Sequence, residues 1–524
     1  ISPVSLNSAI PISTPACIRL LEEADPNGAR AAATALGQVG GPQAIQALFS
    51  IVMSQKGNVR RDTAFDGLLA AANRELAEGR KGNANAAFDK LRTIPAPDHV
   101  RAGAYRGMIM AAAPGRAVEL VRAALQGDDA PVQMAALEAA PGLKAPGVTQ
   151  VLCESLAKAM PPLKVALIEA LRQRGDPAAA PSLAACRQSP DPSVRLAAIA
   201  GLGELGDDSA VQALLEAAGS SDDGEMRTGR QALLVLKRGD VTRSLIGRLA
   251  SGKPPERMEA ARALAGRGDK DAAADLTAAA GMNTDPVRAA LFSALGQLAE
   301  GQDIPALVAL TTGAKDDPAR DEARDALSAA CARLQAASRP AAATSIVKGL
   351  AGASPQARAA LLQAGGVLQD DRLRDELRRA LGDPDPSLRQ AAARALCETR
   401  DPGLLPDLLN FAKQGTDLGQ RVPAVRGYVR LATDTENVRL SSAERVKALE
   451  EVLPMARPEE KWAVLAGLAK LADVDALALA LSMLDDPATR AEAAQAVTAI
   501  ASSLGPTRRE HARMALERVL AAAP

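Results

Sequence analysis

The chain has 524 residues, of which 62 are basic and 62 acidic, so its formal net charge at pH 7 is zero. This balance excludes an overall field that would steer the protein toward nucleic acid or a membrane surface. Hydrophobic residues make up 47% of the chain but aromatic residues only 2%, which predicts a core of alanine, leucine and valine in closely packed helices. No apolar run has the length that a membrane-spanning helix needs.

The N-terminal segment differs from the rest of the chain. Its first fifteen residues contain three prolines and show no helical periodicity, so we expect an extended arm over residues 1–24. The chain starts at Ile1 rather than Met and carries no basic and apolar leader. We interpret it as a processed mature form or an excised fragment.

A repeated helix pair begins at residue 25 and is clearest at residues 189–218. Asp191 is a candidate N-cap and Pro192 suits a first helical turn. Apolar residues then follow at helical spacing in two successive stripes, Val194, Ala198, Leu202 and Leu205, then Val211, Leu214, Leu215 and Ala218. Two short amphipathic helices cannot bury these stripes alone, so each pair needs a copy on either side.

An arginine after the capping proline marks the period of the repeat. It recurs at a near-constant step of about 30 residues, typical of helical-repeat proteins, at Arg195, Arg227, Arg257, Arg288, Arg320 and, one ordinary step beyond the longer step that leads to Arg358, at Arg389. With the Asp-Pro turns, this pattern resembles HEAT repeats, in particular the short form seen in phycobilin-lyase-like proteins of bacteria. The resemblance implies an all-α, right-handed α-solenoid (superhelix) of about fifteen HEAT-like helix pairs. It also implies that these six arginines form a structural ladder, bonded to turn aspartates or carbonyls.

The array changes character along the chain. We expect regular HEAT-like repeats over residues 25–334, then irregular and longer units with a C-terminal cap over residues 335–524. Residues 426–432, 459–477 and 485–497 resemble helical-repeat regions that accompany 3-keto-disaccharide hydrolase domains in exported bacterial proteins. That resemblance implies the alternative of an accessory region in an exported carbohydrate-processing protein. It favours an exported (periplasmic or extracellular) location over a cytoplasmic one, while the compartment itself stays open.

Few residues are candidates for catalysis or metal binding. The two histidines, His99 and His511, are far apart, and the five cysteines form no CxxC pair, which predicts no metal site. The GxGxxG match at residues 201–206 falls at the end of a predicted helix, where glycines serve packing rather than phosphate binding. We therefore predict no catalytic residue, no cofactor and no enzyme activity. A bilin-lyase-like enzyme is an alternative that the family resemblance allows and no residue supports.

The most specific functional prediction is a non-catalytic scaffold or protein–protein interaction module. Basic clusters are short and carry no alternating aromatics, which argues against nucleic acid as the partner; a protein or an adjoining domain fits better. Large amphipathic residues anchor interfaces, and Arg426, Tyr428, Arg430 and Trp462 lie close in the irregular region. We expect these four to border the partner surface, and the oligomeric state stays open.

Overall fold

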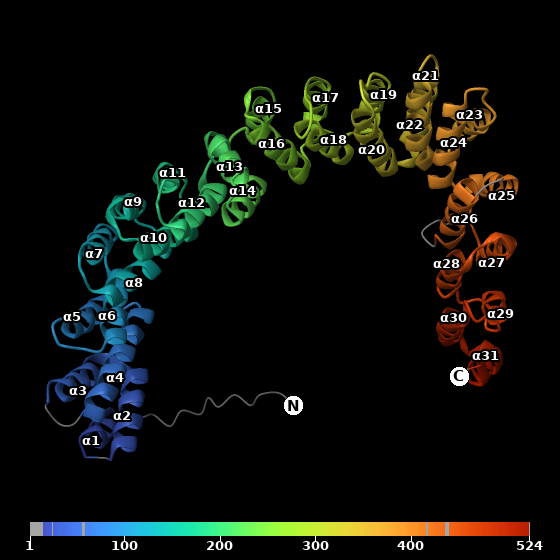
Figure 1. Cartoon of the computed structure of the whole chain (residues 1–524). Helices are drawn as coiled ribbons and strands as arrows, with labels where there is room; N and C mark the ends of the chain where they lie inside the picture. The colour runs from blue at the N-terminus through green and yellow to red at the C-terminus, as the bar shows by residue number, and fades with distance from the viewer. Residues whose placement is uncertain (1–13, 24, 55–57, 416–417, 435–439, 523–524) are drawn as a thin grey trace. The chain divides into compact units, whose positions relative to one another are not determined.

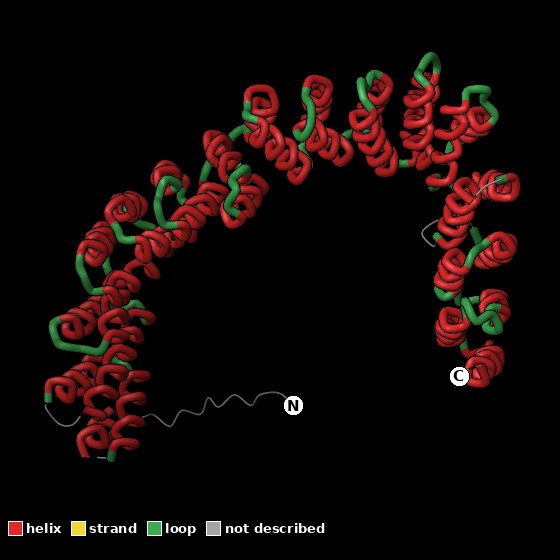
Figure 2. Tube along the Cα trace, viewed as in Figure 1, coloured by secondary structure: helices red, strands yellow, loops and turns green. Residues whose placement is uncertain are grey.

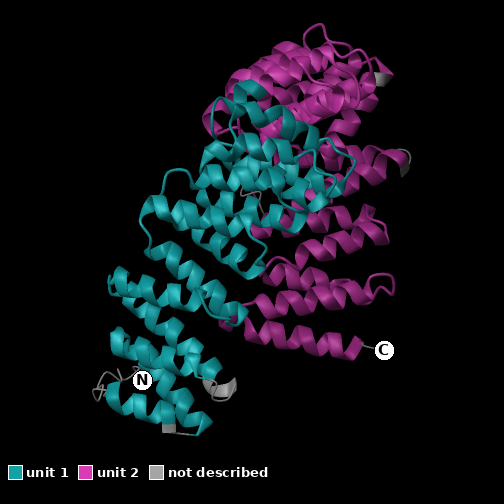
Figure 3. Cartoon of the chain, turned by 90° about the vertical axis from the view of Figure 1, so that its left-hand side faces the viewer, with its two compact units in different colours: residues 1–244 teal, residues 245–524 magenta. Residues whose placement is uncertain are grey.

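The computed structural model describes residues 14–23, 25–54, 58–415, 418–434 and 440–522. These residues form thirty-one α-helices joined by loops and short 3-10 helices, and they contain no strand (Figure 2). The chain divides into two compact units, residues 1–244 and residues 245–524 (Figure 3). The all-α solenoid predicted from the sequence is confirmed.

The first unit contains fourteen complete described helices and the start of the next. They are α1 (Thr14–Glu23), α2 (Pro26–Val39), α3 (Gly41–Met53), α4 (Asn58–Ala77), α5 (Lys81–Arg92), α6 (Asp98–Ala111), α7 (Pro114–Gln126), α8 (Ala130–Ala139), α9 (Val148–Lys158), α10 (Pro161–Arg174), α11 (Ala180–Cys186), α12 (Pro192–Leu205), α13 (Val211–Ala218), α14 (Asp223–Val235) and α15 (Val241–Ser251), which crosses the division.

The second unit continues the same alternation. Its described helices are α16 (Pro254–Arg267), α17 (Ala273–Met282), α18 (Val287–Leu298), α19 (Ile304–Thr312), α20 (Asp317–Arg333), α21 (Arg339–Leu350), α22 (Pro355–Gly365), α23 (Asp371–Leu381), α24 (Pro386–Glu398), α25 (Leu405–Gln414), α26 (Leu418–Thr433), α27 (Ser442–Val452), α28 (Pro458–Leu468), α29 (Val474–Ser482), α30 (Arg490–Ser503) and α31 (Arg509–Ala522).

Within each unit the helices form two layers. Successive even-numbered helices pack on one another, as α12 does on α14 and α24 on α26, while the odd-numbered helices form the second layer (Figure 1). From α2 to α31 the described helices make fifteen consecutive pairs. Each pair therefore buries its apolar stripes against its own partner helix and its neighbours, as the repeat pattern predicts.

The pair α12 and α13 shows how the sequence produces this packing. The Asp191 side chain accepts hydrogen bonds from the backbone N–H groups of Ser193 and Val194, and Pro192 occupies the first turn of α12. All eight residues of the two predicted apolar stripes are at most 3% exposed. A buried leucine or valine side chain contributes about 1.5–3 kcal/mol relative to an exposed one, so the stripes are the main source of stability in each repeat.

One predicted boundary is wrong. The expected extended arm ends earlier, because residues 14–23 form α1, whose Cys17 and Leu21 are one helical turn apart and buried in the core. The rest of that arm lies outside the described residues. The change to longer and less regular units expected after residue 334 stays a prediction; at that point α20 packs directly on α22, and the longer repeat contains the 17-residue helix α20.

The GxGxxG match lies at the C-terminal end of α12 and serves helix packing. A Cβ atom at Gly203 would come within 2.6 Å of Cα and 2.7 Å of Cβ of Ala232 on α14. Both are closer than carbon atoms approach in a packed core, so only glycine lets the two helices lie this close.

We expect Gly203→Ala to destabilise the first unit by about 1–3 kcal/mol, because the added methyl group overpacks the α12–α14 contact. The matched control is Gly82→Ala on α5, where a Cβ atom would meet nothing within 4 Å; it should be neutral or stabilising by less than about 1 kcal/mol. Urea unfolding of both variants measures the difference. A Gly203→Ala variant as stable as the wild type would contradict this account of the glycines.

Candidate functional site

The six ladder arginines lie near the N-terminal ends of even-numbered helices. Arg195 on α12 donates through Nε to Oε1 of Glu225 on α14 at 2.6 Å, and through Nη1 to the carbonyls of Ser189 and Pro190. Arg288 on α18 donates to Glu322 on α20 at 2.7 Å and to Asp285 at 3.1 Å. These two arginines therefore tie one even-numbered helix to the next and also fix the turn before their own helix.

The other four make mostly local contacts. Arg257 donates to the carbonyls of Gly252 and Ala250 and to Asn283, and Arg320 bonds to Asp317 and the carbonyl of Ala314. Arg227 reaches only the carbonyl of Asp223 on its own helix. Arg389 reaches the carbonyls of Asp383 and Pro384 at 2.6 and 2.8 Å. The six arginines are spread along the array and form no common site.

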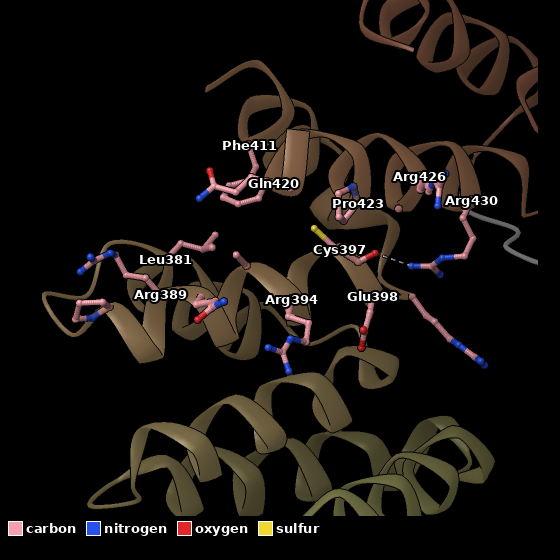
Figure 4. Close-up of a pocket in the computed structure, with 16 residues that line it drawn as sticks. Leu381, Arg389, Arg394, Cys397, Glu398, Phe411, Gln420, Pro423, Arg426 and Arg430 are labelled. Atoms are coloured by element: carbon pink, nitrogen blue, oxygen red, sulfur yellow. Dashed lines mark hydrogen bonds between the residues drawn. The ribbon is translucent and has the colours of Figure 1, made fainter. Parts of the chain in front are cut away.

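A groove with a volume of about 1090 Å³ runs along α24 and α26 in the second unit (Figure 4). One wall is α24, from Pro386 to Glu398, and the other is α26, from Gly419 to Arg430. Leu381 of α23 and Phe411 of α25 complete the lining. We call this feature the α24–α26 groove.

Two residues of α26 shape the groove. Pro423 lies inside the helix, and because proline has no N–H, the carbonyl of Gly419 loses its helical donor. Gly419 and Pro423 both line the groove. Toward the other end, a Cβ atom at Gly427 would collide with the carbonyl of Cys397, so the absence of a side chain there lets α26 approach α24 closely. The two helices thus meet closely at Gly427, and the Gly419 carbonyl without its helical donor lies about two turns nearer the N-terminus of α26.

The groove is strongly basic although the whole chain is neutral. Its lining contains one acidic residue, Glu398, and five arginines, namely Arg389, Arg394, Arg400, Arg426 and Arg430. All five arginines are exposed. Arg394 and Arg400 have no hydrogen bond or ion pair with any residue that the structure describes.

Two of these arginines also have structural partners. Arg430 donates through Nη2 to the carbonyls of Thr399 and Cys397, at 2.7 and 3.2 Å, at the C-terminal end of α24 (Figure 4). Partial burial, and to a smaller extent the neighbouring positive charge of Arg400, lower the pKa of the Arg430 guanidinium. Arg426 donates through Nε to Glu460 of α28 at 3.0 Å, while 61% of its side chain stays exposed.

The structure brings together only two of the four residues expected at the partner surface. Arg426 and Arg430 both line the α24–α26 groove. Trp462, on α28, is 42% exposed and donates its indole N–H to the carbonyl of Ala488, but it does not line the groove. The prediction is wrong for Tyr428, which is only 3% exposed; it sits on the inner side of α26, where burial raises the pKa of its hydroxyl to about 12.

Sequence reasoning missed Arg394 and Arg400. The sequence of α26 contains no acidic residue, but α18 and α22 contain none either, so this absence becomes informative only once α26 is known to face α24. Because α26 has no acidic residue, the arginines of α24 have no carboxylate partner on the helix that faces them.

The remaining candidates for chemistry lie apart from one another. His99 is exposed and lies 2.8 Å from Asp66, and His511 is exposed on α31. All five cysteines are free. In the part of the chain that the structure describes, no three histidine, cysteine or acidic side chains converge as a metal site would require. None of the described helices combines the length and apolarity needed to cross a membrane.

Comparison with known proteins gives matches to two family models. The model described as HEAT repeats matches residues 156–234, 242–328 and 343–425, and that of the PBS lyase HEAT-like repeat matches residues 29–48. No curated protein matches the sequence.

Several solved structures match this chain at low identity. A crystal structure of Kap121p is 12% identical, with a TM-score of 0.42, covering 97% of this chain and 76% of that one. Yeast importin-beta (Kap95p) is 13% identical, with a TM-score of 0.33, covering 97% and 80%. Identities this low carry over no activity and no partner.

We expect Arg195→Ala to lower the free energy of unfolding of the first unit by about 1–3 kcal/mol, because it leaves Glu225 and two turn carbonyls without their charged donor. Arg227→Ala is the matched control one repeat later. It removes a single intrahelical contact and should cost less than about 0.5 kcal/mol. Denaturant titration of the two variants tests this, and equal losses would refute a ladder in which interhelical pairs dominate.

Proposed function

The chain is a HEAT-repeat protein, and we propose that it serves as a non-catalytic scaffold that presents its even-numbered helical layer to another protein. A helical-repeat array buries its own apolar stripes in stacking. Polar and charged groups that stay exposed on one layer are therefore free to contact a partner.

The observation that carries this proposal is the α24–α26 groove. The stacking of repeats does not account for the arginines of this groove, because Arg394 and Arg400 contact no described residue by hydrogen bond or ion pair. Arginine is one of the residue types enriched at the energetic centres of protein interfaces. A concave surface lined by five exposed arginines is better suited to recognising a partner than to stabilising the fold.

The chemistry of the groove supports binding rather than catalysis. Its one thiol, Cys397, is half-buried, and burial raises its pKa to about 11. At neutral pH it is therefore a thiol and not the thiolate that nucleophilic catalysis requires. Arginine stays protonated and cannot act as a general base. The only lining carboxylate, Glu398, is bonded to Gln363 of α22.

No observation on the described residues favours the accessory region of a carbohydrate-processing protein or a bilin-lyase-like enzyme. Neither alternative is therefore proposed as a second function.

Site-specific photo-cross-linking tests the scaffold function. A photoreactive amino acid is placed at Arg394 in the groove and, as a control, at Lys447 on α27, an exposed position of the odd-numbered layer. Both proteins are irradiated in extract from the source organism. We expect the probe at Arg394 to cross-link to a discrete protein, identified by mass spectrometry, and the probe at Lys447 to give none.

Two results would contradict the proposal. One is equal cross-linking at both positions, which would mean that the even-numbered layer is not the binding face. The other is the absence of any cross-linked protein together with turnover of a small molecule by the purified chain.

A further inference from the structure

We infer that the α24–α26 groove binds an extended acidic peptide segment of the partner protein. This inference rests on the proposed scaffold function and names the chemistry of its partner. It follows from the charge, the lining and the length of the groove.

Neighbouring even-numbered helices neutralise one another's charges through ion pairs. Arg172 of α10 pairs with Glu204 of α12, Arg195 of α12 with Glu225 of α14, and Arg426 of α26 with Glu460 of α28. Between the described residues of α24 and α26 there is no such pair, because the sequence of α26 contains no acidic residue at any position. The groove therefore keeps an excess of positive charge, with five arginines and one acidic residue in its lining.

Bringing these guanidinium groups together without counter-ions is unfavourable, and an incoming anion relieves the repulsion. Arg394 and Arg400 offer complete guanidinium forks, because neither donates to any described residue. A guanidinium fork matches a carboxylate with two parallel hydrogen bonds. The groove thus contains two vacant carboxylate-binding groups on one wall.

The rest of the lining distinguishes a peptide from other anions. Leu381, Phe411 and Pro423 add apolar surface, which a free phosphate or another inorganic anion would leave exposed. The Gly419 carbonyl, without its helical donor, can accept a hydrogen bond from a peptide N–H. Nucleic acid would need aromatic stacking platforms, and Phe411 is the one aromatic residue in the lining.

The length of the groove sets the size of the segment. Helix α24 has 13 residues, which at about 1.5 Å per residue gives a wall of about 20 Å. An extended peptide rises about 3.3 Å per residue, so about six residues fill the groove. In an extended segment alternate side chains point to opposite sides, so acids at every second position can face the arginine wall while apolar residues face Phe411.

The experiment uses a capped hexapeptide of alternating glutamate and leucine and measures its binding to the whole chain by isothermal titration calorimetry. Two control peptides carry glutamine or lysine in place of glutamate. We expect the glutamate peptide to bind, the other two not to bind, and the affinity to fall as salt is raised from 50 to 300 mM, because exposed charge pairs are screened.

Arg394→Glu is the variant that tests the location. It should weaken binding of the glutamate peptide about tenfold or more and should gain affinity for the lysine peptide. Arg379→Glu is the matched control: Arg379 lies on α23, 68% of its side chain is exposed, and it does not line the groove. It should change affinity by less than about twofold. Because a charge reversal could disturb folding, Arg394→Gln is measured in parallel, with circular dichroism of each variant.

Each outcome decides the inference. It is overturned if the glutamate and glutamine peptides bind equally, if Arg394→Glu leaves affinity unchanged in a folded protein, or if inorganic phosphate or single-stranded RNA displaces the peptide from the groove at lower concentration than the peptide itself binds. If the probe at Arg394 cross-links a protein but the hexapeptide does not bind, this inference fails while the proposed scaffold function stands.

Discussion

Every repeat in this protein depends on a neighbour to cover its apolar stripe. A pair such as α12 and α13 is too short to bury Leu202 or Leu214 by itself, and those residues are at most 2% exposed only because adjacent helices cover them. The constraint also dictates small residues at the closest contacts, such as Gly203 against Ala232. It explains how a chain with so few aromatic residues forms a continuous core.

Stacking of this kind leaves the outer surface of each layer free to vary, within limits set by charge. Where an arginine pairs with an acid on the next even-numbered helix, as Arg288 does with Glu322, the ion pair holds the two helices together. The guanidinium group is then not available to bind a partner. Where the facing helix has no acid, as α26 has none, Arg394 and Arg400 stay without a hydrogen bond or ion pair to any described residue. The same residue type therefore has two roles in this chain, and the neighbouring helix determines which role it has.

The sequence predicted the repeats well and the site only in part. Period-3.6 spacing is a local property, so the stripes, the Asp191 cap and the number of helix pairs could be read directly. Residues 14–23 were misjudged because prolines nearby hid a short stripe made by Cys17 and Leu21. The long step after Arg320 contains the longer helix α20, which packs on α22 without a break; a step length alone does not distinguish a longer helix from a longer loop.

The candidate surface shows the limit of residue-type reasoning. Tyr428 and Arg430 are two positions apart, so they point to different sides of α26, and only the second lies in the groove. Arg394 and Arg400 belong to an otherwise regular repeat and gave no signal by themselves. Their importance comes from what α26 lacks, and a missing partner can be recognised only once the facing helix is known.

The variant that tests this account most directly is Gln420→Glu, which places an acid in the first turn of α26 on the wall opposite Arg389 (Figure 4). Melting temperature and acidic-hexapeptide affinity are measured on the same sample. The account predicts a higher melting temperature, because the new carboxylate lies in the first turn of a helix and adds a negative charge to the arginine-lined groove, together with at least about tenfold weaker peptide binding. Unchanged peptide affinity in the folded variant would contradict it.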